Sequence, residues 1–506
     1  MNRDTAAALA YHDATKHSLL RLRTNRHTLD WENKPHPFKV YPTIEPLPLP
    51  RELPPSRVPA LAAIAQSEVP VGDQPHVPDL AALARVLHFS SGITRKKVYP
   101  GAQDQYFRAA ACTGALYHVD LYVVCGELPG LAAGVYHFGP HNFALHELRA
   151  GDYRGVLVEA TSAEASVAHA PVIIACASTY WRNSWKYQSR AYRHCFWDAG
   201  TILANLLAVA AAGDLPTRVV CGFVDDTVSR LLGLDPAREG PLALVSLGYE
   251  PRTIAAHAEV PPLSVETLPL SAHEVDYPLI RDMQAASLLP SPEDVRAWRG
   301  NAVSTIADRP PSGQTFALRP LGERAQPTES IDAVILRRGS TREFAPVPIS
   351  FEQLSTILDC ATQEMVTDYG VLPTDLYLIV NAVAGLPPCT YVYHRGGALE
   401  ALRAGTFRSE AGFLGLGQEL AADASANIYF LSNLEPILAR FGNRGYRIAQ
   451  LDAAITAGKM YLAAYALRLG ATGLTFLDDD VTDFFAPHAA GKSVMFLLAV
   501  GRGKKA

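Results

Sequence analysis

A short arginine-rich segment is the part of this sequence best suited to bind a phosphate group. Residues 337–344 read RRGSTREF, so three guanidinium groups and the Ser340 hydroxyl fall within one short stretch. A guanidinium group offers a planar fork of donors that matches phosphate oxygens, and a serine hydroxyl adds a hydrogen bond. The alternative interpretation is a solvated basic surface. The segment predicts an anion site, with Arg337, Arg338, Ser340 and Arg342 as candidate ligands.

Two other segments contain residues that could act beside such a site. Residues 108–117 read RAAACTGALY, a run of small residues that lets the backbone approach a flat ligand, although a tight turn into a strand is the simpler interpretation. Residues 185–193 read WKYQSRAYR. Lys186 beside Tyr187 could transfer a proton if burial lowers the pKa of the lysine, whereas a snorkelling cation at a helix end is the simpler alternative.

Length, composition and charge exclude several classes of protein. The chain has 506 residues, 48% hydrophobic and 19% charged, as in a globular protein with two or three domains. A net charge of −5 provides no broad basic field, which argues against nucleic acid or an anionic membrane as the main partner. The longest apolar run, residues 199–213, is too short to span a membrane.

The cysteines and the N-terminus predict a cytoplasmic protein. Seven cysteines are scattered without a C-x-x-C pair, so neither a zinc site nor a redox dithiol is predicted, and reduced thiols are expected. The first residues, MNRD, lead into a mixed polar stretch, and we see no signal peptide. No metal site is predicted.

The chain contains an internal repeat. Residues 144–154 and 398–408 are identical at seven of eleven positions, at an offset of 254 residues. Asp120 to Tyr122 pairs with Asp375 to Tyr377 at nearly the same offset, and Asp225-Asp226 pairs with Asp479-Asp480. Asp225-Asp226 and Asp478-Asp479-Asp480 precede helices, so we interpret these aspartates as N-caps. A period this long indicates a duplicated domain and not a solenoid.

Each copy has the same predicted order of elements. Strand-like runs precede a long apolar helix, at 190–212 in one copy and 444–469 in the other, and a final strand ends in glycine. This pattern predicts an α+β fold with helices around a mostly antiparallel sheet. We expect a first domain over residues 1–255 with an N-terminal arm at 1–75, a linker with short helices at 256–325, and a second domain at 326–506.

Together these motifs resemble the nitroreductase-like superfamily of FMN-dependent oxidoreductases, and in particular its SagB-type branch, which oxidises azoline rings in peptides to azoles. The segment 337–344 is similar to the family's arm for the FMN phosphate, Arg-Arg-Ser-x-Arg-x-Phe, with one extra glycine. Residues 111–118 replace the family's Pro-Ser-Ala-Gly-Ala-Leu-Tyr-Pro loop and match it from Gly114 to Tyr117. Lys186-Tyr187 matches the Lys-Tyr pair implicated in proton abstraction in that branch, and residues 91–95 are also similar to it.

The resemblance covers roughly residues 75–250 and 330–502 and implies which residues bind FMN. Besides the arm, the residues that it assigns to the cofactor are Ala111, Cys112, Thr113, Gly114, Ala115, Thr475, Lys492 and Arg502. Members of the family are usually homodimers with two FMN sites at the interface, each with its arm from one subunit and its cover from the other. Two tandem domains of this kind predict a pseudo-dimer within one chain, with a higher oligomer left open.

The two composite sites of this pseudo-dimer are unequal in sequence. Composite site one combines the arm 337–344 with the cover 111–117 and the pair Lys186-Tyr187. Composite site two would take its arm from Lys16-His17-Ser18 and its cover from residues 368–373, which lack the run of small residues. Its Lys-Tyr pair is replaced by Arg440-Phe441. We therefore expect one flavin per chain.

The resemblance implies an oxidoreductase but leaves its reaction open. The Lys-Tyr pair favours dehydrogenation of a heterocycle or a similar small or peptidic substrate. One alternative is reduction of a nitro, quinone or enone compound with NAD(P)H as the electron donor. Another is a degenerate flavoprotein that acts as a binding partner, suggested by the departures at Cys112, Thr113 and His118. The substrate and the electron acceptor are not fixed by the sequence.

Overall fold

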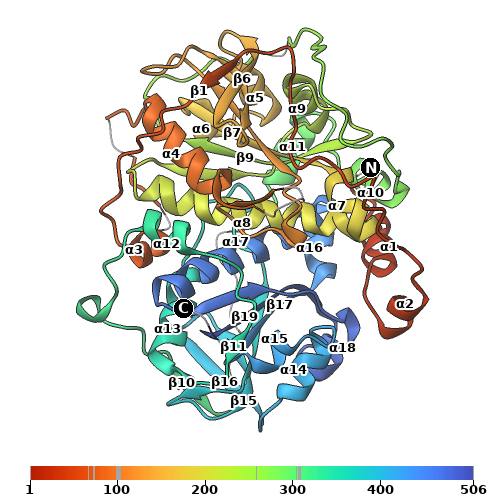
Figure 1. The fold of residues 1–506 in the computed structure, drawn as a ribbon, viewed down its shortest axis with the longest axis vertical. Helices are drawn as coiled ribbons and strands as arrows, with labels where there is room; N and C mark the ends of the chain where they lie inside the picture. The colour runs from red at the N-terminus through yellow and green to blue at the C-terminus, as the bar shows by residue number, and fades with distance from the viewer. Residues whose placement is uncertain are drawn as a thin grey trace.

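Two copies of one α+β unit face each other across a central pair of long helices (Figure 1). The computed structural model describes residues 2–66, 68–71, 74–98, 104–257, 259–303, 305 and 309–504. Within each copy a sheet lies on the outer side of its long helix, so the two sheets are separated by the two helices (Figure 1). The duplication predicted from the sequence is therefore present as two domains within one chain.

The first copy is built on a seven-stranded antiparallel sheet, with the order β1-β6-β5-β4-β7-β9-β8. Every residue of β4, β7 and β9 is buried, because these strands are central and covered on both faces. The strands are β1 (Pro46–Pro48), β4 (Val119–Cys125), β5 (Gly134–Gly139), β6 (Ala144–Ala150), β7 (Val172–Thr179), β8 (Thr217–Val220) and β9 (Glu239–Leu247). The helices are α1 (Ala6–Ala14), α2 (Leu19–Thr24), α3 (Ala60–Ala65), α4 (Leu80–Ser91), α5 (Arg154–Ala160), α6 (Ala165–Ala168), α7 (Tyr180–Tyr187), α8 (Ala191–Ala211) and α9 (Asp225–Leu232).

The second copy repeats this sheet with the order β10-β16-β15-β13-β17-β19-β11, and β18 pairs with β19. Its strands are β10 (Thr315–Ala317), β11 (Phe344–Ala345), β13 (Thr374–Val380), β15 (Cys389–His394), β16 (Ala398–Ala404), β17 (Ala426–Ser432), β18 (Gly470–Gly473) and β19 (Ser493–Gly503). A separate parallel pair is formed by β12 (Ile349–Ser350) and β14 (Val383–Ala384). The helices are α12 (Ile331–Arg337), α13 (Phe351–Ala361), α14 (Arg408–Leu414), α15 (Glu419–Asp423), α16 (Leu434–Phe441), α17 (Arg444–Ala466) and α18 (Asp478–Phe484).

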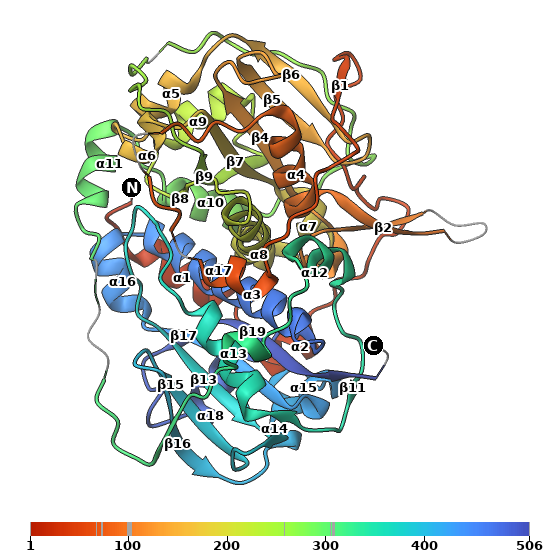
Figure 2. The same cartoon turned by 90° about the vertical axis from the view of Figure 1, so that its left-hand side faces the viewer.

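The segments outside the repeat wrap around both copies. Residues 256–325 contain α10 (Pro278–Ala286) and α11 (Pro292–Arg299), and they also supply β10 to the second sheet at the position that β1 occupies in the first. A hairpin of β2 (Ile93–Lys97) and β3 (Gln105–Arg108) projects from the first copy, and the second copy has no strand pair at the corresponding place (Figure 2). The two copies are therefore similar in their sheets and differ in the segments at their interface.

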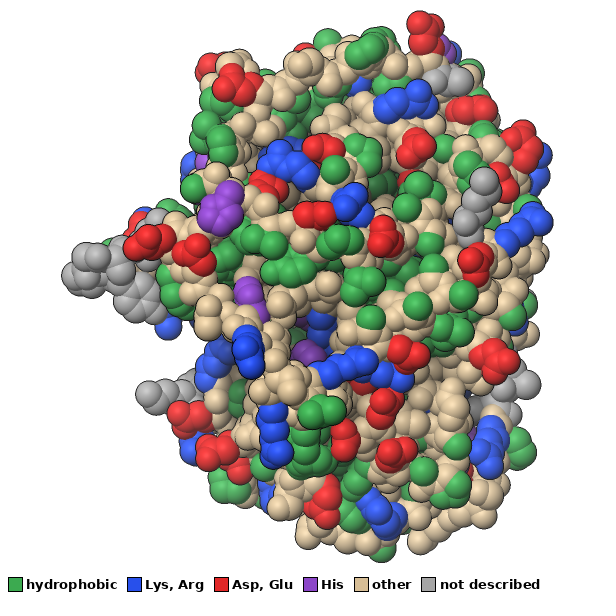
Figure 3. Space-filling view, turned by 90° about the vertical axis from the view of Figure 1, so that its right-hand side faces the viewer, with side chains coloured by type: hydrophobic (Ala, Val, Ile, Leu, Met, Phe, Trp, Pro, Cys, Tyr) green, Lys and Arg blue, Asp and Glu red, His purple; other side chains and the backbone are tan. Residues whose placement is uncertain are grey.

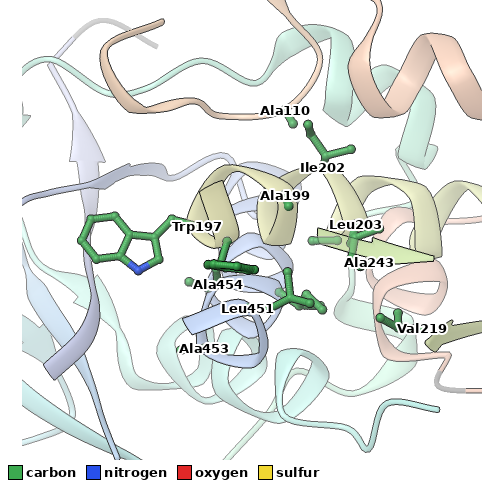
Figure 4. Close-up of a cluster of buried hydrophobic side chains, with 14 of the residues drawn as sticks. Ala110, Trp197, Ala199, Ile202, Leu203, Val219, Ala243, Leu451, Ala453 and Ala454 are labelled. Atoms are coloured by element: carbon green, nitrogen blue, oxygen red, sulfur yellow. The ribbon is translucent and has the colours of Figure 1, made fainter. Parts of the chain in front are cut away.

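Small residues allow α8 and α17 to cross closely. A β-carbon at Gly200 would lie 2.5 Å from the β-carbon of Ala454, and one at Gly458 would lie 2.6 Å from that of Ala204. Side chains from both helices, among them Leu203 and Leu451, meet in one buried cluster (Figure 4). The two helices thus form a shared core, which the two copies bury together.

Buried ion pairs lock the two copies to each other reciprocally. Asp225 of the first copy contacts Arg444 at 2.6 Å and Arg447 at 2.8 Å, and all three side chains are at most 2% exposed. Asp478 of the second copy contacts Arg190 and Arg193 of the first in the same way. The interpretation of these aspartates as N-caps is wrong, because each is the first helical residue and uses its carboxylate to neutralise two guanidinium groups.

Among the described residues, one helical stretch is long and apolar enough to cross a membrane. It comprises residues 180–211, and 89% of its apolar window is buried inside the protein. The stretch includes α8, which packs against α17, so its apolar character is explained by the shared core.

Candidate functional site

The predicted cover, residues 108–117, is held in place by Asp198 of α8. The Asp198 carboxylate accepts hydrogen bonds from the Thr113 backbone N–H (2.9 Å) and hydroxyl (2.8 Å) and from the Cys112 thiol (2.9 Å). The Nε2 atom of His118 lies 2.9 Å from the same carboxylate. Burial and the neighbouring carboxylate raise the pKa of Cys112 well above its usual value, so the thiol stays protonated and acts as a donor. Asp198 therefore fixes the shape of the cover.

The arm and the cover come into direct contact, as the predicted composite site one requires. Arg338, which is buried, donates hydrogen bonds to the carbonyl oxygens of Ala109 (2.9 Å) and Arg108 (3.3 Å) in the other copy. The Tyr461 hydroxyl donates to the Ser340 hydroxyl at 2.8 Å. The Thr341 backbone N–H donates to the carbonyl of Ala471 in β18. The arm is therefore anchored both to its own copy and to the cover.

The arginines of the arm have different roles. Arg337 is paired with Glu329 at 2.5 Å and donates to the Tyr465 carbonyl, so its guanidinium group is engaged within the second copy. Arg342 is exposed, and among the described residues no acidic partner or hydrogen bond is found for its side chain. Arg502 lies in the strand that pairs with the end of the arm, opposite Ala345, and is likewise exposed and unpaired within the described chain.

A third cation, Arg95 of the first copy, lies next to the arm. Arg95, on the β2–β3 hairpin, has its guanidinium nitrogen 3.6 Å from the position of a β-carbon on Gly339. It stacks on Phe107 at 4.8 Å and has no described acidic partner. Arg95 beside Gly339, Arg342 within the arm and Arg502 opposite its end thus place three exposed positive charges along the arm, which suits a phosphate group. The face drawn in Figure 3 has a hollow between the two halves of the molecule, with Lys, Arg and His side chains around it.

The Lys-Tyr pair lies against the cover. A β-carbon on Gly114 would lie 2.7 Å from the Tyr187 hydroxyl, and Gly114 has a φ of 65°, so glycine is needed both for space and for the backbone. Lys186 is exposed at the end of α7, with its amine 5.3 Å from the centre of the Tyr187 ring. Burial raises the pKa of Tyr187 well above its usual value, and the Asp198 carboxylate adds to the effect.

A loop after β18 completes composite site one. Among the described residues, the backbone N–H groups of Thr475 and Phe476 have no hydrogen-bond partner. The Thr475 hydroxyl faces the His17 ring nitrogen at 3.2 Å. Free backbone donors beside a positively charged arm can bind an acceptor-rich ligand.

At composite site two, a side chain of that site's cover occupies the backbone N–H groups of the equivalent loop. Asp368 accepts hydrogen bonds from the backbone N–H groups of Cys221 (2.8 Å) and Gly222 (2.7 Å), which correspond to those of Thr475 and Phe476. Val219 also pairs with this cover through two backbone hydrogen bonds. The backbone donors that are free at composite site one are thus occupied at composite site two. There the loop of the first copy and the cover of the second copy are in direct contact.

The segment Lys16-His17-Ser18 does not form the arm of composite site two. The His17 backbone N–H donates to Asp478 at 2.7 Å, and Lys16 pairs with Asp13 and Asp479, each at 2.8 Å. The segment therefore lies on the second copy beside Thr475, next to composite site one. The assignment from sequence is wrong because the path of the N-terminal arm depends on contacts with the other copy.

Lys492 lies away from the other predicted cofactor ligands. It immediately precedes β19 and pairs with Asp375 at 2.6 Å, whereas Arg502 is near the far end of the same strand. Ten residues of extended strand separate the two by about 34 Å. The structure therefore places Arg502 beside the arm that contains Arg338, Ser340 and Arg342, Thr475 beside His17, and Lys492 elsewhere.

The comparisons with known proteins agree with this architecture. The model of the nitroreductase family matches residues 76–249 and 335–502, so the chain belongs to the nitroreductase family. The crystal structure of a putative nitroreductase from Anabaena variabilis is similar to 98% of this chain and 99% of its own, with 26% identity and a TM-score of 0.78. That similarity extends over both copies.

Two other relatives match smaller parts of the chain. A putative nitroreductase of Methanocaldococcus jannaschii is 24% identical over 169 residues, which are 33% of this chain and 80% of that protein. The E. coli microcin synthetase McbBCD complex, solved with truncated pro-MccB17 bound, has 18% identity over 48% of this chain and 86% of the matched one, with a TM-score of 0.30.

Two residues that build composite site one were not assigned to it from the sequence. Asp198 belongs to a helix without any motif, and the contacts that it makes are apparent only in the folded chain. Arg95 belongs to a segment similar to the azoline branch, which was a signal for function but not for a ligand. The position of Arg95 next to Gly339 follows from the docking of one copy on the other.

Proposed function

We propose that the protein is an FMN-dependent oxidoreductase that binds one flavin per chain, at composite site one. The observation that carries the proposal is the contrast between the two related loops: Asp368 occupies the N–H groups of Cys221 and Gly222, whereas those of Thr475 and Phe476 are free. The family membership supports a flavin as the ligand.

The residues present at composite site one fit FMN. Arg95, Arg342 and Arg502 would hold the phosphate, since each is a fork of donors without a competing carboxylate. Ser340 would add a hydroxyl, and the run of small residues around Gly114 allows the backbone to approach a flat ring. Arg338 would act as a positioning residue, because it ties the arm to the cover and is itself buried.

The proposed reaction is the dehydrogenation of a heterocycle or a similar small or peptidic substrate. FMN, when bound, supplies the two-electron acceptor for hydride. The protein supplies the group that takes the proton from the substrate, and Lys186 and Tyr187 are our candidates because they lie beside the cover. Lys186 is exposed, so the burial that its role as a base requires is not supplied by the chain itself and would have to come from the bound flavin and substrate. The buried Tyr187 hydroxyl is suited to hold and orient the substrate or the lysine.

Flavin content tests the assigned cofactor site. The full chain is supplemented with FMN, desalted, and its bound flavin is quantified by absorbance after denaturation. We expect one FMN per chain and a strong loss of retention in Arg342→Ala and Arg502→Ala. Arg324→Ala removes another exposed arginine of the second half and serves as the control. Two flavins per chain, or full retention in both the Arg342→Ala and the Arg502→Ala variants, would contradict the assignment.

Anaerobic mixing tests the direction of the reaction. Thiazoline- or oxazoline-containing peptides should bleach the flavin of the loaded enzyme, and Lys186→Ala should slow this bleaching while FMN stays bound. Rapid bleaching by NADPH alone, with none by azolines, would instead favour a reductase of nitro, quinone or enone compounds. A protein that retains no FMN after supplementation would favour a degenerate binding partner.

A further inference from the structure

The second copy contains a partly open cavity of about 80 Å³ that the proposed oxidoreductase activity does not use. Its described lining residues all belong to the second copy and include residues 370–372 of the cover of composite site two, and none of them belongs to composite site one. The walls come from the loop 362–372, from β13, β15 and β17, and from α17. Buried apolar side chains such as Leu376, Tyr393 and Phe430 form its floor. An apolar lining with a few polar groups is typical of a small-molecule site.

Asp452 is the charged residue that α17 contributes to the described lining of this cavity, and comparison with its counterpart in the first copy explains why its environment is unusual. Asp198 and Asp452 are related by the offset of 254 residues between the copies. Asp198 accepts hydrogen bonds from Cys112, Thr113 and His118. Asp452 accepts one described hydrogen bond, from the Tyr369 hydroxyl at 3.4 Å.

The donors that satisfy Asp198 have been replaced in the second copy. At the offset of 255 residues, Cys112, Thr113 and His118 correspond to Thr367, Asp368 and Pro373. The Thr367 hydroxyl donates to the Gly370 carbonyl instead. The Asp368 carboxylate faces the first copy, and a proline ring has no donor. The same replacements remove the imidazole ring that fills this space in the first copy, so the carboxylate and the cavity appear together.

The remaining charges of the cavity favour a cation. Glu364, Asp375 and Asp452 line it, but Asp375 is paired with Lys492 at 2.6 Å. The one basic residue among the described lining residues is Arg395, whose guanidinium group donates to the Leu372 carbonyl at 2.7 Å. A carboxylate in an apolar cavity costs free energy unless a donor or a positive charge reaches it. Burial accordingly raises the pKa of Asp452 to about 6, with Arg395 and Tyr369 opposing the shift, so the group is ionised in neutral and alkaline buffer.

We propose that this cavity is a second ligand site, specific for a small organic cation with an apolar body, such as an aromatic amidine or amine, that pairs with Asp452. The cation would take the place of the donors that the first copy supplies from its own cover. The apolar body would lie against Leu376 and Phe430.

Binding of three matched probes to the full chain, supplemented with FMN, tests this proposal. Benzamidine is the cation, benzamide its neutral analogue and benzoate its anionic analogue, and affinities are measured by ligand-observed NMR or calorimetry at pH 8. We expect benzamidine to bind at least tenfold more tightly than either analogue. Asp452→Asn, which keeps the shape of the side chain, should remove that preference.

Two further variants show whether a change in binding comes from this cavity. Asp483→Asn removes an exposed carboxylate of α18 and should leave the affinity for benzamidine unchanged. Thr456→Phe places a ring in the cavity one turn from Asp452 and should abolish binding of all three probes. Equal affinity of wild type and Asp452→Asn for benzamidine, or no binding to the wild type, would overturn the proposal. Flavin content is measured on the same samples, so failure of this site is distinguished from failure of the proposed FMN site.

Discussion

Asp225→Asn is the substitution that tests most directly how the two copies are held together. The Asp225 carboxylate lies 2.6 Å from Arg444 and 2.8 Å from Arg447, and it also accepts a hydrogen bond from the Leu289 backbone N–H at 3.2 Å. The aspartate and both arginines are buried. Asparagine preserves the shape but leaves two guanidinium groups without their counter-charge.

The expected cost of this change follows from its burial. Breaking a buried ion pair by removing one partner costs about 3–5 kcal/mol, because the remaining charge cannot be solvated. An unfolding entropy of about 2.1 cal/mol/K per residue, applied to 506 residues, gives about 1 kcal/mol per degree. We therefore expect the melting temperature to fall by about 3–5 °C.

Urea unfolding and calorimetry of the full chain measure this effect. Asp226→Asn is the matched control, since the neighbouring carboxylate is exposed and no ion pair is described for it. We expect a change below about 0.5 kcal/mol for the control, as for other surface substitutions. If the two variants unfold at the same urea concentration, the argument that buried charge locks the copies together is refuted.

Three further predictions concern the same interface. Burial opposes ionisation of Asp478, but Arg190 and Arg193 hold its pKa well below the usual value. The contribution of the carboxylate to stability is therefore full above about pH 4 and is lost as the pH falls below that. Acid unfolding of Asp478→Asn should depend less on pH than acid unfolding of the wild type. Gly200→Val should cost about 1–3 kcal/mol in urea unfolding, since α17 leaves no room for the side chain, whereas Gly322→Ala, in open space, should be neutral. Asp368→Ala should cost about 1–3 kcal/mol by leaving two backbone N–H groups unpaired, with no loss of FMN from composite site one; a loss of flavin would show that the two sites are not independent.

Much of the fold could be predicted from the sequence, because its signals are local or repeated. The offset of 254 residues established the duplication, and alternating or continuous apolar runs indicated the strands. The expected helices at 190–212 and 444–469 are α8 and α17, which end within three residues of those bounds. The arm and cover were predicted from motifs of a few residues, and their role in binding FMN stays a prediction.

The tertiary structure decided which of these residues work together. Arg337 and Arg338 look equivalent to Arg342 in the sequence, yet Arg337 pairs with Glu329 and Arg338 binds the cover. Arg95 joins the arm from the other copy, and Lys492 lies at the opposite end of the strand that contains Arg502.

The inequality of the two sites has the same origin. The sequence predicted it from missing motifs, whereas the structure supplies its physical cause: Asp368 satisfies two N–H groups across the interface, and His17 lies beside the other site. Such contacts join residues that are hundreds of positions apart. They depend on how one copy docks on the other, which no pattern of neighbouring residues specifies.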